Sequence, residues 1–412
     1  MLAAIVERHA EEASFLWSLR DGAVLAPHFH LRALCELDER VEANLDGLRV
    51  AGEAGWSLCA AALDEEDPGK VFAATALAME RRDLTDLAVI LDAAGESPEL
   101  SRGMVSALGW IDFEVTHAVL PGLLDPEGPA PLHALGIAAC AVHRQDPGPL
   151  LRQALLSDEP RLLGRALRAV GELGRVDLLP DVQAQLGSAP GACRFFAAWS
   201  AAVLGDARAI EVLWEVAQRG GPHGERASAL LMRRADPGTA GRSLQALAQR
   251  PETRRAALAC AGSLGDPRQI PWLLERMADP EQARLAAESF TMITGADLVA
   301  ERLAKRAPEG FEAGPSEDPA DDRVSADPDE HLPWPDVTAV EAWYGRHVAE
   351  LPRGARLLLG KPMGADWLQR VLRQGRQRQR AAAALEIAIQ ARGRPLFEVR
   401  APGFFQARAL GG

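Results

Sequence analysis

The sequence predicts an all-α protein: a solenoid of short helix hairpins, followed by a small C-terminal helical segment with a short strand. Of the 412 residues, 48% are hydrophobic and only 5% are aromatic. The apolar residues are mainly Ala, Leu and Val, and Ala and Leu favour helices that pack closely. An Ala-rich helix followed by Gly, usually Asp, and a second helix recurs along the chain. The recurrence has a period of about 30 residues, which is typical of repeat architectures.

Residues 1–56 are predicted to form a helical cap at the start of the repeats. Two helices are expected, one near residues 3–20 and one over residues 31–50. The second carries one apolar stripe, because its apolar residues recur at three- and four-residue steps: Leu31, Leu34, Leu37, Val41, Leu45 and Leu48. A cap is needed because an end repeat otherwise exposes its core face.

Residues 57–306 are predicted to form the repeat array, with roughly eight helix pairs. Gly174, Gly205 and Gly265 end Ala-rich helices, since Gly readily adopts the left-handed conformation that stops a helix. An Asp that follows accepts hydrogen bonds from the free N–H groups of the next helix, and Pro fits its first position. These capping positions are Asp83, Asp112, Asp146-Pro147, Asp206, Asp236-Pro237 and Asp266-Pro267.

The composition changes twice after the array. Residues 307–337 are rich in acidic residues, Pro and Gly, and predict an exposed linker that cannot bury enough to order itself. Residues 338–412 form a basic helical region, with 12 Lys and Arg against 3 Asp and Glu between Pro352 and Gly412. Two helices are expected there, over 365–374 and 376–391, with a break at Gly375 and a strand-like segment at 396–400.

The repeats resemble the HEAT-like repeats of phycobilisome lyases, in which an Ala-Leu-rich helix, Leu-Gly-Asp and a shorter Leu-rich helix follow one another. Two segments extend this resemblance to a bacterial family of HEAT-like repeat proteins. Residues 44–56, NLDGLRVAGEAGW, resemble its opening, and residues 376–386 and 396–403 resemble its close. Members are often encoded near type VI secretion components. The resemblance implies a solenoid and a protein partner, and it carries over no catalytic residue.

Charge and cysteine usage restrict the function classes. The net charge is −13, and an acidic chain repels phosphate backbones, so a general nucleic-acid-binding function is disfavoured. Charged residues interrupt the apolar N-terminus early, and no long uncharged apolar run predicts a membrane helix. The cysteines are isolated and odd in number, which favours buried thiols in a reducing cytoplasm: Cys35, Cys59, Cys140, Cys193 and Cys260.

No catalytic set, cofactor or resident metal is predicted. The sequence lacks GxxxxGK[ST], GxGxxG and GxSxG motifs, and it lacks the His-Glu pairs with which HEAT-like deoxyhypusine hydroxylases bind iron. His28 and His30 would share one face of a strand and could there bind a metal. They are expected in the loop before residue 31, so a solvated or helix-capping pair is favoured.

Six residues are candidates for protein binding. Trp214 and Trp272 fall on second helices of repeats, and Trp is a common interface anchor, although both are more often core residues. Trp334 lies between two prolines, so it is either fixed against the array or exposed for recognition. The basic residues are Arg373, Arg376 and Arg380, which an unbroken helix would present on a common side to an acidic surface. That surface is either the protein's own array and acidic linker, which is favoured because the linker is tethered nearby, or a partner.

The sequence therefore predicts a non-enzymatic scaffold that binds a protein. The resemblance specifies an adaptor, chaperone or assembly factor of a type VI secretion locus. The alternative is an enzyme, lyase- or hydroxylase-like, acting in a groove of the solenoid. A deep pocket with clustered ionisable groups would favour the enzyme, and an open face would favour the binding protein.

Overall fold

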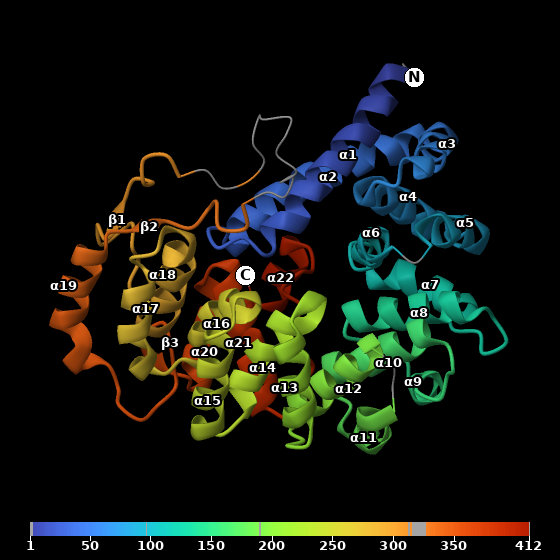
Figure 1. Ribbon diagram of the computed structural model, residues 1–412. Helices are drawn as coiled ribbons and strands as arrows, with labels where there is room; N and C mark the ends of the chain where they lie inside the picture. The colour runs from blue at the N-terminus through green and yellow to red at the C-terminus, as the bar shows by residue number, and fades with distance from the viewer. Residues whose placement is uncertain (1–2, 96, 189–190, 312–313, 315–326, 412) are drawn as a thin grey trace. The chain divides into compact units, whose positions relative to one another are not determined.

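The computed structural model describes residues 3–95, 97–188, 191–311, 314 and 327–411. The chain is mostly helical, at 72%, and the described residues form 22 α-helices that follow one another as pairs (Figure 1). The predicted all-α repeat fold is therefore confirmed. The chain divides into two compact units, Met1–Leu204 with Leu372–Gly412, and Gly205–Val371.

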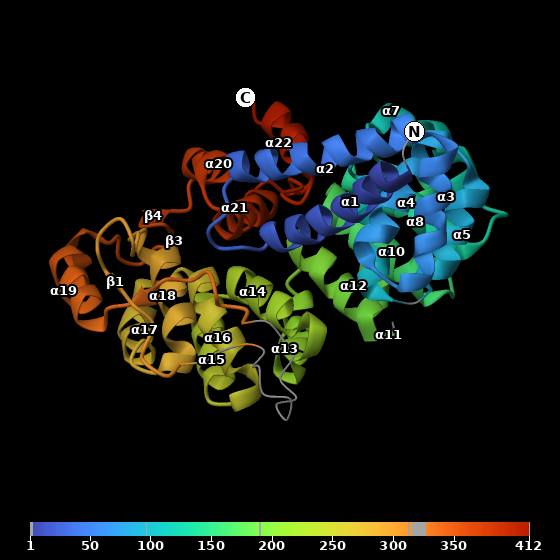
Figure 2. The same cartoon turned by 90° about the horizontal axis from the view of Figure 1, so that it is seen from above.

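The first unit opens with three helices, α1 (Ala3–Ala23), α2 (Leu31–Ala51) and α3 (Glu53–Ala61). Helix α1 runs alongside α2 and also packs against the first repeat (Figure 2). The apolar stripe predicted for α2 faces inward, and Leu34, Leu45 and Leu48 are fully buried. His30 caps α2, because its ring nitrogen accepts a hydrogen bond from the Ala33 N–H at 3.1 Å.

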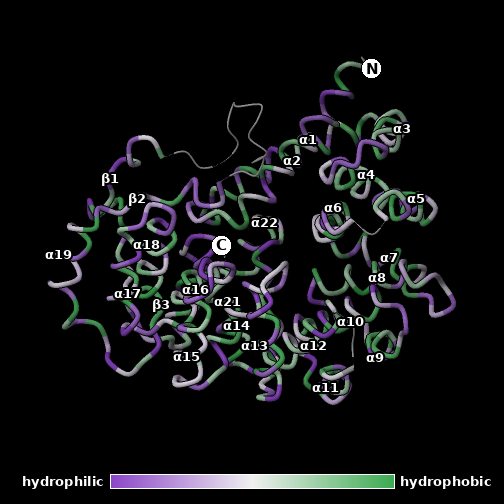
Figure 3. Tube along the Cα trace, in the orientation of Figure 1, coloured by the Kyte–Doolittle hydropathy of each residue, from purple (hydrophilic) through white to green (hydrophobic). Residues whose placement is uncertain are grey.

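The repeats of the first unit stack through the first helix of each pair. Helices α4, α6, α8, α10 and α12 contact one another in that order. Hydrophobic and hydrophilic positions alternate along these helices, as expected when one face packs inward (Figure 3). The helices of this part are α4 (Pro68–Arg81), α5 (Leu84–Ala94), α6 (Pro98–Leu108), α7 (Phe113–Leu123), α8 (Ala130–Val142), α9 (Pro149–Ala154), α10 (Pro160–Leu173), α11 (Leu179–Ser188) and α12 (Gly191–Val203).

The second unit continues the pattern through a stack of α14, α16 and α18. Its helices are α13 (Ala209–Arg219), α14 (Gly224–Arg234), α15 (Pro237–Ala248), α16 (Pro251–Leu264), α17 (Ile270–Arg276), α18 (Pro280–Thr294) and α19 (Val337–His347). Two antiparallel strand pairs follow the stack: β1 (Ala304–Lys305) with β2 (Trp334–Pro335), and β3 (Leu357–Leu358) with β4 (Lys361–Pro362). Helix α20 (Ala365–Gln374) begins in this unit and ends in the first.

Most predicted helix junctions are present. Gly174, Gly205 and Gly265 have positive φ angles of 69°, 94° and 68°. The carboxylates of Asp83, Asp112 and Asp236 cap α5, α7 and α15, and that of Asp266 caps the 3-10 turn before α17.

Two capping predictions were wrong in position. Asp146 accepts from the Gly148 N–H, and α9 begins only at Pro149. Asp206 accepts from the Arg208 N–H, and α13 begins at Ala209. At both places a tight turn precedes the helix, so the carboxylate closes the turn instead of capping the helix.

The array also ends earlier than residue 306. Gly295 ends α18 with a φ of 80°, as the period requires, but no second helix follows it. Asp297 instead accepts from the N–H groups of Val299 and Ala300 in a turn. The chain then enters β1, which pairs with β2 near the end of the predicted linker. Residues 312–313 and 315–326 of that linker lie outside the described residues.

The C-terminal region returns to the first unit. Helix α21 (Gln377–Gln390) packs against α12, and α22 (Gly403–Ala409) packs against α2. The predicted break at Gly375 is present. Residues 396–400, expected as a strand, have no strand pairing, and the Leu396 N–H donates to the Glu172 carbonyl at 2.9 Å.

Gly265 shows how closely the second unit packs at a helix end. A Cβ atom there would lie 2.4 Å from the carbonyl oxygen of Leu357, and the φ angle is 68°. We therefore expect Gly265→Ala to lower the free energy of unfolding by about 1–3 kcal/mol. At Gly241, inside α15, a Cβ atom would have no other atom within 4 Å. Gly241→Ala should raise stability by about 0.5–1 kcal/mol. Urea denaturation followed by circular dichroism measures both, and equal effects would contradict the packing at Gly265.

Candidate protein-binding site

The six residues predicted for protein binding are divided between the two units: Trp214, Trp272 and Trp334 belong to the second, and Arg373, Arg376 and Arg380 to the first. Trp214 on α13 and Trp272 on α17 are both partly buried and lie two repeats apart. No ring contact joins these two side chains in the described part of the chain. They are therefore separate half-buried positions of the array, and neither is surrounded by other candidate residues.

Trp334 is held against the array of the second unit. Its ring lies 4.7 Å from the guanidinium carbon of Arg284 on α18, and the Phe311 ring meets it edge-on at 4.7 Å. Arg284 also pairs with Asp327 at 2.7 Å, and Arg255 on α16 pairs with Asp329 through two 2.7 Å hydrogen bonds. Of the two alternatives for Trp334, the structure has the one in which the ring is fixed by its surroundings.

The three arginines differ from one another in exposure. Arg373 is exposed at the end of α20, Arg376 is half-buried at the start of α21, and Arg380 is completely buried. The expectation of a common acid-binding side was wrong, because the chain breaks at Gly375 and Arg376 forms a β-bridge with His30. Arg380 binds neutral acceptors: the Leu372 carbonyl at 2.8 Å and the Gln406 side chain at 2.6 Å, besides Gln377. Burial lowers its pKa to about 10, so it stays charged at neutral pH.

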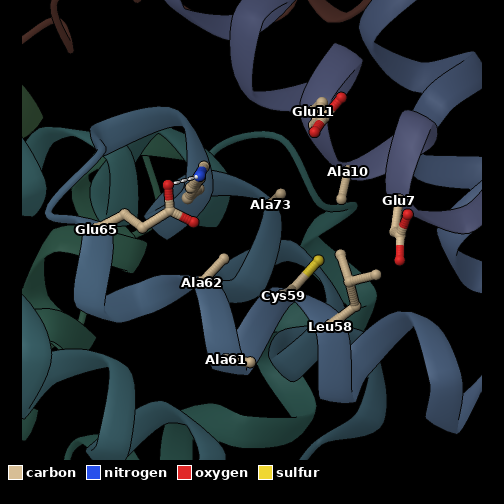
Figure 4. A pocket seen from close by; sticks show the side chains of 10 residues that line it. Glu7, Ala10, Glu11, Leu58, Cys59, Ala61, Ala62, Glu65 and Ala73 are labelled. Carbon is tan, nitrogen blue, oxygen red and sulfur yellow. Dashed lines mark ion pairs between the residues drawn. The ribbon is translucent and has the colours of Figure 1, made fainter. Parts of the chain in front are cut away.

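A better candidate lies where α1 meets α3 and α4. A hollow of about 270 Å³ opens there, and its lining is mostly small or apolar: Ala10, Leu58, Cys59, Ala61, Ala62 and Ala73. Glu7 and Glu11 of α1 stand on one side, and Glu65 stands on the other, paired with Lys70 (Figure 4). Burial raises the pKa of Cys59 to about 12, so this thiol is neutral at physiological pH. The hollow therefore combines an apolar floor with an acidic rim.

A second hollow of about 410 Å³ continues over α1 itself. Its lining includes Glu7 and Glu11 again, and extends along the helix to Glu12 and Phe15. Glu7 and Glu11 are exposed, and neither has an ion-pair partner among the described residues. The two hollows therefore share a ridge of carboxylates, and we call the hollows together with this face of α1 the α1 surface.

The exposed face of α1 is unusually apolar for a helix that faces solvent. Ile5, Phe15 and Leu19 are 49%, 60% and 47% exposed. They lie on one stripe with Arg8 and Glu12, which form an ion pair at 4.0 Å between Ile5 and Phe15. Exposed large apolar side chains among charged ones are typical of an interaction surface. This helix was predicted only as part of the cap and its exposed surface was not predicted, although the heptad spacing of Ile5 and Leu19 is visible in the sequence.

The comparisons with known proteins bring no relative to this site: no family model matches the chain, and no curated protein matches it significantly. None of the described helices is long and apolar enough to span a membrane. Within the described ranges, no three His, Cys, Asp or Glu side chains are grouped so as to hold a metal ion. All five cysteines are free thiols.

The buried state of Arg380 gives a test of the tail's packing. Arg380→Ala removes the donors of three buried acceptors, so we expect a loss of about 2–5 kcal/mol in the free energy of unfolding and faster proteolysis of residues 372–412. Arg373→Ala is the matched control, and it should change stability by no more than about 0.5 kcal/mol because the side chain is exposed. Urea denaturation and limited proteolysis measure both variants. Similar losses in the two would contradict the different roles of these arginines.

Proposed function

We propose that the protein is a non-enzymatic scaffold whose α1 surface binds a basic amphipathic helix of a partner protein. The single observation that carries the proposal is the exposed apolar stripe of α1 beside two carboxylates that have no ion-pair partner in the described structure. An amphipathic helix lays its apolar side chains into such a surface and uses its flanking charges for orientation. The partner's Lys or Arg residues would face Glu7 and Glu11.

The lining of the hollow supports binding over catalysis. Five of its ten residues are Ala or Leu on α1, on α3 and the 3-10 turn that follows it, and on α4, and they offer contact area without a reactive group. Its one thiol, Cys59, has a pKa of about 12, whereas a nucleophilic cysteine needs a lowered pKa. The carboxylate of Glu65 forms an ion pair with Lys70. These properties favour the binding protein over the lyase- or hydroxylase-like enzyme.

Charge also argues against a second copy of the chain as the occupant. If two α1 helices paired through their stripes, the interface would gather Glu7, Glu11 and Glu12 of both copies, with Arg8 of each copy as the only base in this lining. Like charges across an interface are unfavourable. A basic helix removes this repulsion, and its charge is opposite in sign to the protein's net charge of −13.

The cellular role follows from the sequence resemblance. We propose an adaptor, chaperone or assembly factor that acts in the cytoplasm on a component or effector of a type VI secretion system. A solenoid suits this role because its stacked repeats supply a long surface with no intrinsic chemistry.

The α1 surface is tested with a fluorescein-labelled 18-residue helix of Leu and Lys, measured by fluorescence anisotropy. We expect Glu7→Lys with Glu11→Lys to weaken binding about tenfold or more, which is about 1.4 kcal/mol. Phe15→Ser should weaken it as well, because the apolar contact is lost. The controls are Asp92→Lys with Glu127→Lys, which has the same charge change on exposed residues, and Val89→Ser, which removes an apolar side chain that is 52% exposed on α5. Equal binding by the variants and their controls would overturn the proposal.

The cellular role needs a separate experiment. A photoreactive phenylalanine derivative in place of Phe15 should crosslink, in the native host, to a basic helical segment of a type VI secretion component. The same derivative in place of Val89 is the control. A specific crosslink to a protein outside that system would refute the secretion role and leave the binding surface intact.

A further inference from the structure

A network of arginines crosses the first unit, away from the apolar stripe of α1. The arginines come from four separated parts of the chain: Arg102 of α6, Arg144 after α8, Arg165 and Arg168 of α10, and Arg400 near the C-terminus. Three carboxylates hold them together: Asp21, Glu172 and Glu398. The protein as a whole is acidic, so a concentration of arginines here is not a consequence of its composition.

The contacts run continuously through the network. Asp21 accepts from Arg102 at 2.9 Å and from Arg400 at 2.7 Å, one on each carboxylate oxygen. Glu172 holds Arg168 at 2.7 Å and also Arg165.

Glu398 completes the connection between these groups. It pairs with Arg144 at 3.0 Å and accepts from the Arg400 N–H at 3.0 Å. It also lies close enough to Arg168 for its charge to raise the pKa of that guanidinium. The five arginines therefore belong to one connected cluster.

Exposure separates the two signs of charge. The side chains of Asp21, Glu172 and Glu398 are 15%, 5% and 18% exposed. Those of Arg102, Arg168 and Arg400 are 45%, 36% and 39% exposed. The carboxylates are thus covered, while the side chains of these three arginines are partly exposed. Five arginines against three carboxylates leave an excess of two positive charges in the cluster as a whole.

The electrostatics of Glu172 show that the inner layer is strongly positive. Burial by itself would raise the pKa of Glu172, but the charges of Arg165, Arg168 and Arg144 outweigh burial and hold the pKa well below its usual range. At Arg400, burial is the main cause that lowers the pKa, Arg20 and Arg168 add to it, and the carboxylates of Asp21 and Glu398 oppose it. The excess of positive charge is therefore expressed at Glu172, where the arginines outweigh burial.

We propose that Arg102, Arg168 and Arg400, which we call the arginine face, form a second binding surface that takes an acidic peptide segment through two or more of its carboxylates. The planar guanidinium group presents paired donors that match the two oxygens of a carboxylate. Asp21 and Glu172 each take one nitrogen from each of two arginines, so the remaining N–H groups of Arg102, Arg168 and Arg400 can bind the incoming carboxylates. This surface is separate from the proposed α1 surface and takes the opposite charge, so neither depends on the other.

The modest charge of the network favours an acidic peptide over nucleic acid. Nucleic-acid surfaces neutralise a dense row of phosphates with many Lys and Arg residues. Here only two positive charges are in excess, and Glu398 and Asp21 lie close behind the exposed guanidinium groups. Two or three carboxylates along a peptide match this excess of two positive charges. A phosphate backbone brings one negative charge per nucleotide, and the buried carboxylates would repel part of it.

The test compares a fluorescein-labelled hexaglutamate peptide with hexaglutamine on the full chain. We expect the glutamate peptide alone to bind, and Arg102→Gln with Arg168→Gln to weaken it at least fivefold. The control is Arg40→Gln with Arg152→Gln, which makes the same charge change at exposed arginines on α2 and α9 and should leave binding unchanged. Circular dichroism verifies that each variant is folded. Equal binding by both double variants would overturn the proposal, and tighter binding of a twelve-nucleotide single strand would replace it with a nucleic-acid surface.

A measurement on the unaltered protein keeps the proposal testable if the double variant does not fold. Phenylglyoxal modifies exposed arginines, and mass spectrometry locates the modified residues. Saturating hexaglutamate should protect Arg102, Arg168 and Arg400 by at least about threefold in rate, and it should not protect Arg152, which is 55% exposed. Uniform protection of all four, or none at all, would contradict a specific arginine face.

Discussion

The first unit depends on a buried ion pair between its N-terminal helices. Arg20 of α1 and Asp38 of α2 meet at 2.9 Å, and neither side chain is more than 2% exposed. Burying two charges costs desolvation that their attraction repays only when the remaining donors and acceptors are also satisfied. The C-terminal tail satisfies them: the Ala401 carbonyl accepts from Arg20 at 2.8 Å, and the Gly403 N–H donates to Asp38. The N-terminal hairpin and the tail are therefore stabilised together.

This constraint explains why the last part of the chain belongs to the first unit. Gly403 approaches Cys35 so closely that a Cβ atom would lie 2.7 Å from its sulfur, so only Gly permits the contact. Arg380 of α21 is buried there, and its guanidinium group donates hydrogen bonds to neutral acceptors. The same return brings Glu398 and Arg400 to α10 and α1. Without the tail, the arginine face would lose one of its three outer guanidinium groups.

Helix α1 carries both kinds of surface because its two halves differ in their surroundings. From Glu7 to Phe15 it exposes Glu7 and Glu11 beside the hollow lined by α3 and α4, and Phe15 in the second hollow. Its last turn places Arg20 and Asp21 in contact with the tail. An acidic apolar surface and a basic surface thus occur in one unit of an acidic protein. The two are suited to partners of opposite charge.

The sequence by itself determined the features that arise from neighbouring residues. Helix caps such as Asp83, stops such as Gly265 and the break at Gly375 depend on local hydrogen bonds and backbone angles, so they were predictable. The capping predictions for Asp146 and Asp206 were wrong in position because a tight turn and a helix cap use the same kind of hydrogen bond, from a nearby backbone N–H to the carboxylate. Only the tertiary structure decided where the tail lies and which arginines come together, because the parts that meet are distant in sequence: Gly403 and Asp38 are 365 residues apart. No periodicity in the sequence encodes this contact. It depends on the buried ion pair, whose remaining donors and acceptors find partners only in the folded chain.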